Sequence, residues 1–180
     1  MLELSDFKFA TFCEALRISD FDCGDADINE FLKDDAFNYQ EQKIANTYCF
    51  IDRNEEIIAF FSISNDCLND LGYSNNAWNR FHRRIKLPNE KRIRQYPSMK
   101  IGRLGINKSY QGRGLANQLM DFIKGWTTLE LKPACRLLLL DAYNKTQQLN
   151  YYVKNDFQFL LDDDIKDKTR LMYFDLSRLD

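Results

Sequence analysis

The stretch that decides the fold reads IGRLGINKSYQGRGLANQLM, from Ile101 to Met120. It begins as a short strand-like run, continues through a polar segment with glycines at 112 and 114, and ends in a run with helical apolar spacing. A helix N-terminus offers unpaired N–H groups and a positive dipole end, and glycine lets the backbone approach a bulky anion. The stretch therefore predicts either a phosphate-binding loop or a plain turn between a strand and a helix.

Two familiar nucleotide loops do not fit this stretch. A P-loop requires the string GxxxxGK[ST], which the chain lacks. The dinucleotide fingerprint GxGxxG fails because Gly112-Arg113-Gly114 has no third glycine and lies deep in the chain. Neither a P-loop fold nor a Rossmann fold is expected.

The rest of the chain alternates helical and strand-like patterns. Residues 25–40 have helical spacing with Asp25 as a plausible N-cap, and Thr47–Ile51 with Ile57–Ser64 is typical of a β-hairpin. Met99–Ile106 is expected to be a strand, followed by a helix in which Leu115 and Leu119 face the core. The C-terminal third predicts a buried strand over 135–142, a helix over 146–155, and closing strands over 157–161 and 171–176. The pattern is α/β with a mixed sheet, in a single domain spanning residues 1–180.

Composition bounds the class of protein. The chain is 44% hydrophobic and carries 25 basic against 27 acidic side chains, as in globular proteins. It has no apolar run of membrane-spanning length and no signal-peptide pattern, so no membrane partner is expected. Five scattered cysteines indicate a reducing, cytoplasmic setting. With His82 as the one histidine and no paired cysteines, no metal site is expected.

The charge is unevenly distributed along the chain. Residues 1–79 carry 5 basic and 16 acidic side chains, whereas residues 80–100 carry 8 basic and 1 acidic. This basic segment is broken by Pro88 and Pro97. It is either an anion-binding surface or a solvated face of a loop or helix.

Three segments together resemble a known family. Gln111, Gly114 and Ala116 form Q-x-x-G-x-A, which resembles motif A, [RQ]-x-x-G-x-[GA], of the GNAT superfamily of N-acetyltransferases. The later stretch DAYNKTQQLNYYVKNDFQFL is similar to that family's next strand, its asparagine and its aromatic-rich helix. Upstream, FDCG followed by NEFL resembles the F-D-C-G…N-x-F-L opening of a bacterial subfamily, which includes toxins that acetylate aminoacyl-tRNA. The resemblance covers about residues 20–176 and implies the GNAT fold.

The resemblance implies acetyl-CoA as cosubstrate and assigns residues to it. Backbone groups of Leu104, Gly105 and Ile106 would pair with the pantetheine arm, and the missing side chain of Gly105 would let the arm lie close. Asn144 would cap the next helix and contact the same arm. Successive N–H groups would wrap the pyrophosphate along the segment Gln111, Gly112, Arg113, Gly114, Leu115 and Ala116.

The resemblance also implies a catalytic tyrosine. Attack of an amine on a thioester expels a thiolate, and a phenol within reach can give it a proton. Tyr152 aligns with the family's tyrosine, and Tyr151 with the preceding core position; the alternative is that both side chains only pack. Asn155-Asp156 departs from the family, which commonly has glycine before Phe157. No general base is evident, although acidic side chains on the early helix, Asp66 and Asp70 are candidates.

The acceptor stays open at this point. The expected reaction is acetyl transfer to a primary amine of a small molecule or a protein. The alternatives are toxin-like acetylation of aminoacyl-tRNA, bound through residues 80–100, and a non-catalytic CoA-binding module. The toxin members of the family imply a ribbon-helix-helix antitoxin as partner, and a homodimer is a further expectation.

Overall fold

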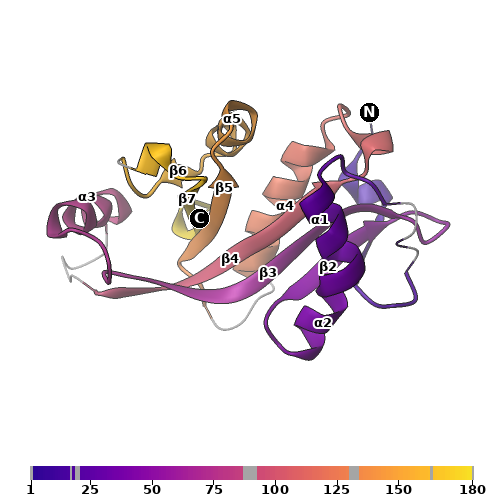
Figure 1. Cartoon of the computed structure of the whole chain (residues 1–180), viewed down its shortest axis with the longest axis horizontal. Helices are drawn as coiled ribbons and strands as arrows, with labels where there is room; N and C mark the ends of the chain where they lie inside the picture. The colour runs from indigo at the N-terminus through magenta and orange to yellow at the C-terminus, as the bar shows by residue number, and fades with distance from the viewer. Residues whose placement is uncertain are drawn as a thin grey trace. The chain divides into compact units, whose positions relative to one another are not determined.

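The computed structural model describes residues 2–16, 18, 21–86, 93–129, 134–162 and 164–179. The strands are β1 (Lys8–Thr11), β2 (Asn46–Ile51), β3 (Ile57–Asn69), β4 (Gln95–Ile106), β5 (Leu137–Tyr143), β6 (Gln158–Phe159) and β7 (Thr169–Asp175). The helices are α1 (Ala26–Glu30), a π-helical segment η2 (Phe31–Asp35), α2 (Ala36–Glu41), α3 (Asn75–Ile85), α4 (Leu115–Leu129) and α5 (Thr146–Lys154). Within the described residues the strands form a sheet in the order β1-β2-β3-β4-β5-β7-β6 (Figure 1).

The chain divides into two compact units. Unit 1 comprises Met1–Ser64 and Ile101–Ile123, and unit 2 comprises Asn65–Lys100 and Lys124–Asp180. Strands β3 and β4 and helix α4 therefore contribute residues to both units. None of the described helices is long and apolar enough to cross a membrane.

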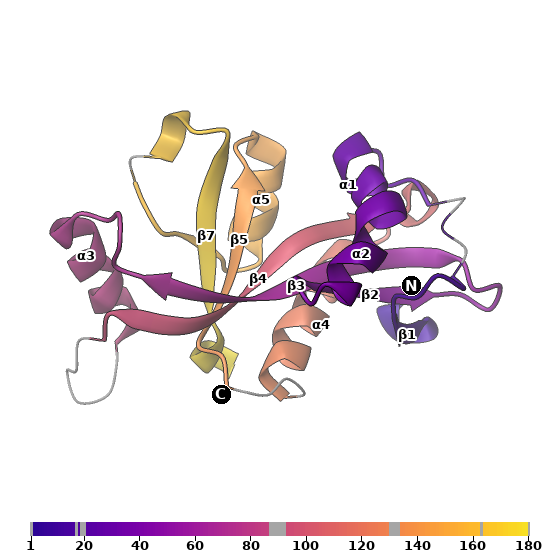
Figure 2. The same ribbon diagram turned by 60° about the horizontal axis from the view of Figure 1, so that its bottom comes forward.

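In unit 1, successive residues of β3 face opposite sides of the sheet, as the period of a strand requires. Phe60 packs against Phe21 and Phe31, on the side covered by the helical segment α1–α2. Its neighbour Phe61 packs against Phe122 of α4 on the other side. The aromatic hairpin that the sequence predicts is thus covered on both faces (Figure 2).

The helix predicted over residues 25–40 is confirmed, with an irregularity that the sequence did not reveal. Asp25 caps it, because its carboxylate accepts from the N–H groups of Asp27 and Ile28. The five residues of η2 form a π-helical segment, and Phe31 and Leu32 are buried there. Such segments are rare and leave i→i−4 hydrogen bonds unmade, so periodicity does not predict them.

In unit 2, helix α3 joins the ends of β3 and β4 (Figure 2). Its apolar residues Trp78, Phe81 and Ile85 are buried in a cluster that includes Tyr96 and Tyr173. The sequence did not predict this helix, since the basic residues among its apolar positions also suit a solvated loop.

One further feature of the basic segment differs from the sequence expectation. Pro97 does not break the chain, because it lies inside β4. Its carbonyl accepts from the N–H of Arg136 at 2.8 Å, just before β5 begins. Pro88 lies within 87–92, outside the described residues.

Candidate functional site

The predicted phosphate loop is present as a tight turn before α4. Gly112 and Gly114 have positive φ values of 74° and 86°, and a Cβ added at either would meet no atom within 4 Å. The glycines are therefore required by backbone conformation and not by crowding. Residues 111–114 are exposed, whereas the side chains of Leu115 and Leu119 are buried, as expected for the core side of α4.

The amides of this loop are available to an anion. Among the residues that the structure describes, the N–H groups of Gly112, Arg113 and Gly114 have no hydrogen-bond partner. Alternating backbone conformations that bring successive N–H groups together form a concave anion site, and the dipole of the 15-residue helix α4 adds to it. The Arg113 guanidinium lies 5.6 Å from the ring centroid of Tyr110, which keeps its charge beside the loop.

Gln111 has another role than the one expected. Its N–H already donates to the Lys108 carbonyl at 3.2 Å, closing the short 3-10 turn Lys108–Tyr110. Its side-chain amide donates to the carbonyls of Ile106 and Cys23, each at 2.8 Å. Gln111 is therefore bonded to protein backbone through both its main chain and its side chain.

The end of β4 explains Gly105 differently from the resemblance. A Cβ at Gly105 would lie 2.8 Å from Phe60 Cε1 and 3.2 Å from side-chain atoms of Ile28 and Phe21. The absence of a side chain at Gly105 is therefore needed by the packing of β4 against β3 and α1. Leu104 and Ile106, on either side of it, are partly buried.

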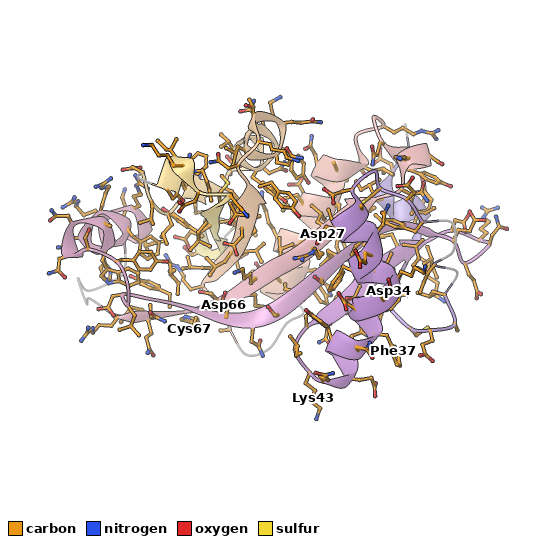
Figure 3. The ribbon with its side chains drawn as sticks, viewed as in Figure 1. Asp27, Asp34, Phe37, Lys43, Asp66 and Cys67 are labelled. Carbon is orange, nitrogen blue, oxygen red and sulfur yellow. The ribbon has the colours of Figure 1, made fainter. Side chains whose placement is uncertain are left out.

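A side chain of β3 bonds the backbone of β4 just before these residues. The Arg103 N–H donates to Ser62 Oγ at 2.8 Å, and Ser62 is buried. The Arg103 side chain lies between Asp27, at 3.3 Å, and the ring of Phe31, at 5.6 Å from its centroid. Figure 3 shows Asp27 on α1. The sequence did not single out Ser62, and a lone serine in an apolar strand gives no signal for this role.

Tyr152 lies on α5, whose C-terminal end is well defined. Its ring packs edge-on against Phe157, with centroids 5.9 Å apart, and beside Tyr151 at 5.1 Å. Burial raises the pKa of Tyr152 to about 12, so the phenol keeps its proton at neutral pH. Within the described part of the chain no hydrogen bond to its hydroxyl is present.

Asn144 does not cap α5, contrary to expectation. The N-cap is Lys145, which makes no side-chain cap bond. The Asn144 amide instead donates to the carbonyls of Ile165 and Asp167, at 2.7 and 2.9 Å, and its N–H donates to the Lys168 carbonyl. Its side-chain donors thus hold the turn η5 (Asp164–Lys166) in place.

The candidates for a general base are engaged in other contacts. Asp70 accepts from Arg94 Nε at 2.6 Å, and Asp66, labelled in Figure 3, accepts from the Cys67 N–H at 2.6 Å. His82, which the sequence did not put forward as a base because it lies amid positive charge, has its Nδ1 2.7 Å from the Tyr96 hydroxyl. None of these arrangements identifies a base.

Several basic side chains of the segment 80–100 form ion pairs with acidic residues of the same chain. Arg80 and Arg84 pair with Asp162, and Arg84 also donates to the Phe159 carbonyl at 3.1 Å. Lys100 pairs with Asp141 at 2.7 Å. Arg83 and Lys86 are exposed and form no ion pair with a described residue, so they are the remaining candidates for an anion contact in the described part of this segment. Lys91 and Arg92 lie outside the described residues.

No group of three or more His, Cys, Asp or Glu side chains among the described residues could hold a metal ion. The sequence also gave no reason to connect the F-D-C-G opening with the loop. The structure makes that connection through Lys108 and Gln111.

Several solved structures are similar to this chain over nearly its whole length. No family model matches the chain. A tyrosine-to-phenylalanine variant of the AtaT toxin, bound to the C-terminus of antitoxin AtaR and acetyl-CoA, matches with a TM-score of 0.70 at 17% identity, over 97% of this chain and 96% of that one. A tyrosine-to-phenylalanine variant of KacT matches with a TM-score of 0.69 at 21% identity, over 97% and 99% of the two chains.

A third match is AtaT complexed with acetyl-methionyl-tRNAfMet, with a TM-score of 0.70 at 17% identity and 97% coverage of both chains. These likenesses extend over nearly the whole length of each protein. They establish that the chain shares the α/β fold of these proteins, which confirms the GNAT fold expected from the resemblance.

Proposed function

We propose that this chain is an acetyl-CoA-dependent N-acetyltransferase that transfers an acetyl group to a primary amine by direct attack. The observation that carries the proposal is the loop before α4, where two left-handed glycines leave three successive N–H groups without partners among the described residues. Such a loop fits the diphosphate of CoA. The AtaT structure with bound acetyl-CoA, which shares the fold, supports the same ligand.

In this proposal the protein binds acetyl-CoA, orients its thioester and supplies a proton to the leaving sulfur. Acetyl-CoA, when bound, supplies the activated acetyl thioester. The amides of Gly112, Arg113 and Gly114, with the first turn of α4 at Leu115 and Ala116, hold the diphosphate. The backbone of residues 104–106 is proposed to contact the pantetheine arm, as is the Asn144 side-chain oxygen, since the Asn144 amide donors already bond Ile165 and Asp167.

Tyr152 is proposed as the general acid. The amine nitrogen forms a bond to the acetyl carbon, the C–S bond breaks, and the nitrogen loses a proton to water. After Tyr152 has given its proton to the sulfur, the phenolate takes one back from water, so the products are the acetylated amine and CoA thiol. Burial raises the pKa of the Tyr152 phenol to about 12 from an ordinary value that already lies above neutral pH, so the phenol is protonated and has a proton to donate to the leaving sulfur. The proposal requires the phenol to come within hydrogen-bonding reach of that sulfur.

One domain spanning residues 1–180 is part of the same proposal.

Aminoacyl-tRNA is a second candidate acceptor. AtaT complexed with acetyl-methionyl-tRNAfMet shares the fold, and Arg83 offers an exposed positive charge on α3. Against it stands the pairing of Arg80, Arg84 and Lys100 with carboxylates of the same chain. An antitoxin partner, as in the AtaT complex with AtaR, belongs to this candidate alone.

One experiment separates these acceptors. The purified protein is incubated with isotope-labelled acetyl-CoA and a mixture of amines, protein lysate and charged tRNA, and the products are identified by mass spectrometry. Label on free amines or on protein supports the first acceptor class, and label on aminoacyl-tRNA supports the second. CoA binding without any labelled product would favour a non-catalytic module.

A further inference from the structure

The Phe21–Gly24 segment is tied to the phosphate loop by a set of hydrogen bonds within unit 1. The Asp22 carboxylate lies 2.8 Å from the Lys108 ammonium, and the Asp22 carbonyl accepts from the Lys108 N–H at 2.8 Å. The Cys23 carbonyl accepts from the Gln111 side chain at 2.8 Å. Residues almost ninety positions apart are thereby joined at three points, just before the glycines of the loop.

Asn29 fixes this segment on α1. Its Oδ1 accepts from the Cys23 N–H at 2.9 Å and from Cys23 Sγ at 3.1 Å. Its Nδ2 donates to Asp22 Oδ1 at 2.9 Å. The same Asp22 oxygen accepts from the Gly24 N–H at 2.8 Å. One hydrogen-bond network thus includes the side chains of Asp22, Cys23 and Asn29 from the F-D-C-G…N pattern.

The other two residues of F-D-C-G have structural reasons of their own. Gly24 has a φ of 90°, and a Cβ there would lie 3.0 Å from Lys108 Cε, so glycine serves both the turn and the approach of the lysine. Phe21 is buried against Phe60 beneath β4. The segment is therefore anchored on the apolar side as well as on the polar side.

Gln111 is suited to this position because it presents two N–H donors on one nitrogen. Those donors bond the Cys23 carbonyl and the Ile106 carbonyl, the last residue of β4. An arginine would also offer paired N–H donors, whereas a carboxylate would offer none. The geometry gives a physical reason for arginine or glutamine at the first position of the loop pattern.

We propose that Phe21–Gly24 and Asn29 form a brace that holds the loop in its diphosphate-binding conformation, with Gln111 and Lys108 as positioning residues. This inference rests on the proposed function, since it assigns the loop to a diphosphate. The brace fixes the loop before binding, and a preformed site binds more tightly because less conformational entropy is lost. No step of the acetyl transfer is assigned to the brace.

The test compares a donor that has the diphosphate with one that lacks it. Gln111→Met keeps the length of the side chain and removes its donors, and we expect CoA to bind roughly tenfold more weakly by calorimetry, the loss typical of two hydrogen bonds. Turnover of S-acetylpantetheine, which has no diphosphate, should fall by clearly less than the CoA affinity does, although Gln111 also bonds the Ile106 carbonyl beside the proposed position of the pantetheine arm. Gln111→Arg should restore most of the CoA affinity.

The matched control is Gln118→Met on α4. Gln118 also bonds two backbone groups of a distant segment, accepting from the Leu4 N–H and donating to the Leu2 carbonyl, but it does not contact the loop. Its loss should lower the melting temperature without changing CoA affinity. If Gln111→Met fails to fold, Asp22→Asn serves instead, since it removes the ion pair with Lys108 and keeps an acceptor for Gly24.

The outcomes separate the two proposals. Unchanged CoA affinity in Gln111→Met or, where that variant does not fold, in Asp22→Asn overturns the brace. Equal losses with CoA and S-acetylpantetheine overturn it too, because the defect would then be general. A wild-type protein that binds no CoA overturns the proposed function itself.

Discussion

The Phe157 N–H donates to the Tyr152 carbonyl at 3.0 Å and closes the C-terminal end of α5. The Asp156 N–H donates to the Val153 carbonyl at 3.0 Å, so the two bonds form a Schellman motif with Asp156 at a φ of 63°. Lys124, itself buried, donates to the Asn155 carbonyl at 2.7 Å. The end of the helix that carries Tyr152 is thus held by three separate bonds.

This geometry predicts the effect of Asp156→Gly. A residue that has a Cβ is strained in the left-handed conformation, whereas glycine is not. Aspartate tolerates this conformation better than most residues do. The variant should raise the free energy of unfolding by about 0.5–1 kcal/mol, measured by urea denaturation. A decrease would mean that the Asp156 side chain stabilises the turn by contacts that outweigh the strain.

Tyr152→Phe should lower kcat by roughly a hundredfold and leave the affinity for acetyl-CoA nearly unchanged, as expected for loss of a general acid. The pH dependence has a definite sign. Because the pKa of Tyr152 is raised from 10.0 to about 12, the phenol stays protonated through pH 10, and the wild-type rate should not fall between pH 9 and pH 10. A fall in the wild-type rate between pH 9 and pH 10 that is absent in Tyr152→Phe would contradict the raised pKa. Equal kcat values for the wild type and Tyr152→Phe would rule out the catalytic role.

Two glycine-to-alanine variants should have opposite effects on stability. Gly105→Ala places a methyl group 2.8 Å from Phe60 Cε1 and should destabilise the protein by about 1–3 kcal/mol. Gly125→Ala, in α4, places one where nothing lies within 4 Å and should stabilise the helix by up to about 1 kcal/mol. Thermal unfolding measures both, and a stable Gly105→Ala variant would refute the packing account of β4.

If aminoacyl-tRNA is the acceptor, Arg83→Glu should reduce tRNA acetylation and lower the salt dependence of tRNA binding by about one phosphate contact. Turnover of a small amine should not change. Lys8→Glu, the same charge reversal at an exposed residue of β1, is the control. Arg84 is a poor probe, because its reversal would also break the contacts with Asp162 and Phe159. Equal loss of tRNA acetylation in Arg83→Glu and Lys8→Glu would mean that tRNA binding depends on the net charge of the protein and not on the position of Arg83.

The sequence predicted most of the elements because their periodicities are strong. The hairpin, the helix from Leu115, the strand over 135–142 and the helix over 146–155 lie within a few residues of β2–β3, α4, β5 and α5. Helix α3 was missed, since its basic residues obscure the apolar stripe of Trp78, Phe81 and Ile85.

The site was predicted less completely, and the reason is tertiary. The glycines of the loop can be recognised from their spacing in the sequence, because few residues other than glycine adopt positive φ values. The roles of Gly105, Asn144 and the Gln111 side chain depend on groups 20 to 90 residues away, such as Phe60, Ile165 and Cys23. Spacing within one segment carries no information about such partners.

The central claim is that the loop before α4 binds the diphosphate of CoA, and calorimetric titration with CoA tests it most directly. Gly114→Glu adds a negative charge at the loop and should weaken binding by roughly a hundredfold or more, since like charges at close range cost several kcal/mol. Gly72→Glu is the matched control, because Gly72 also has a positive φ, 83°, with nothing within 4 Å of its Cβ, but lies in a turn before α3. Tight binding by wild type and Gly72→Glu with loss in Gly114→Glu is the predicted result; equal affinity in all three proteins, or no binding by wild type, would contradict the account.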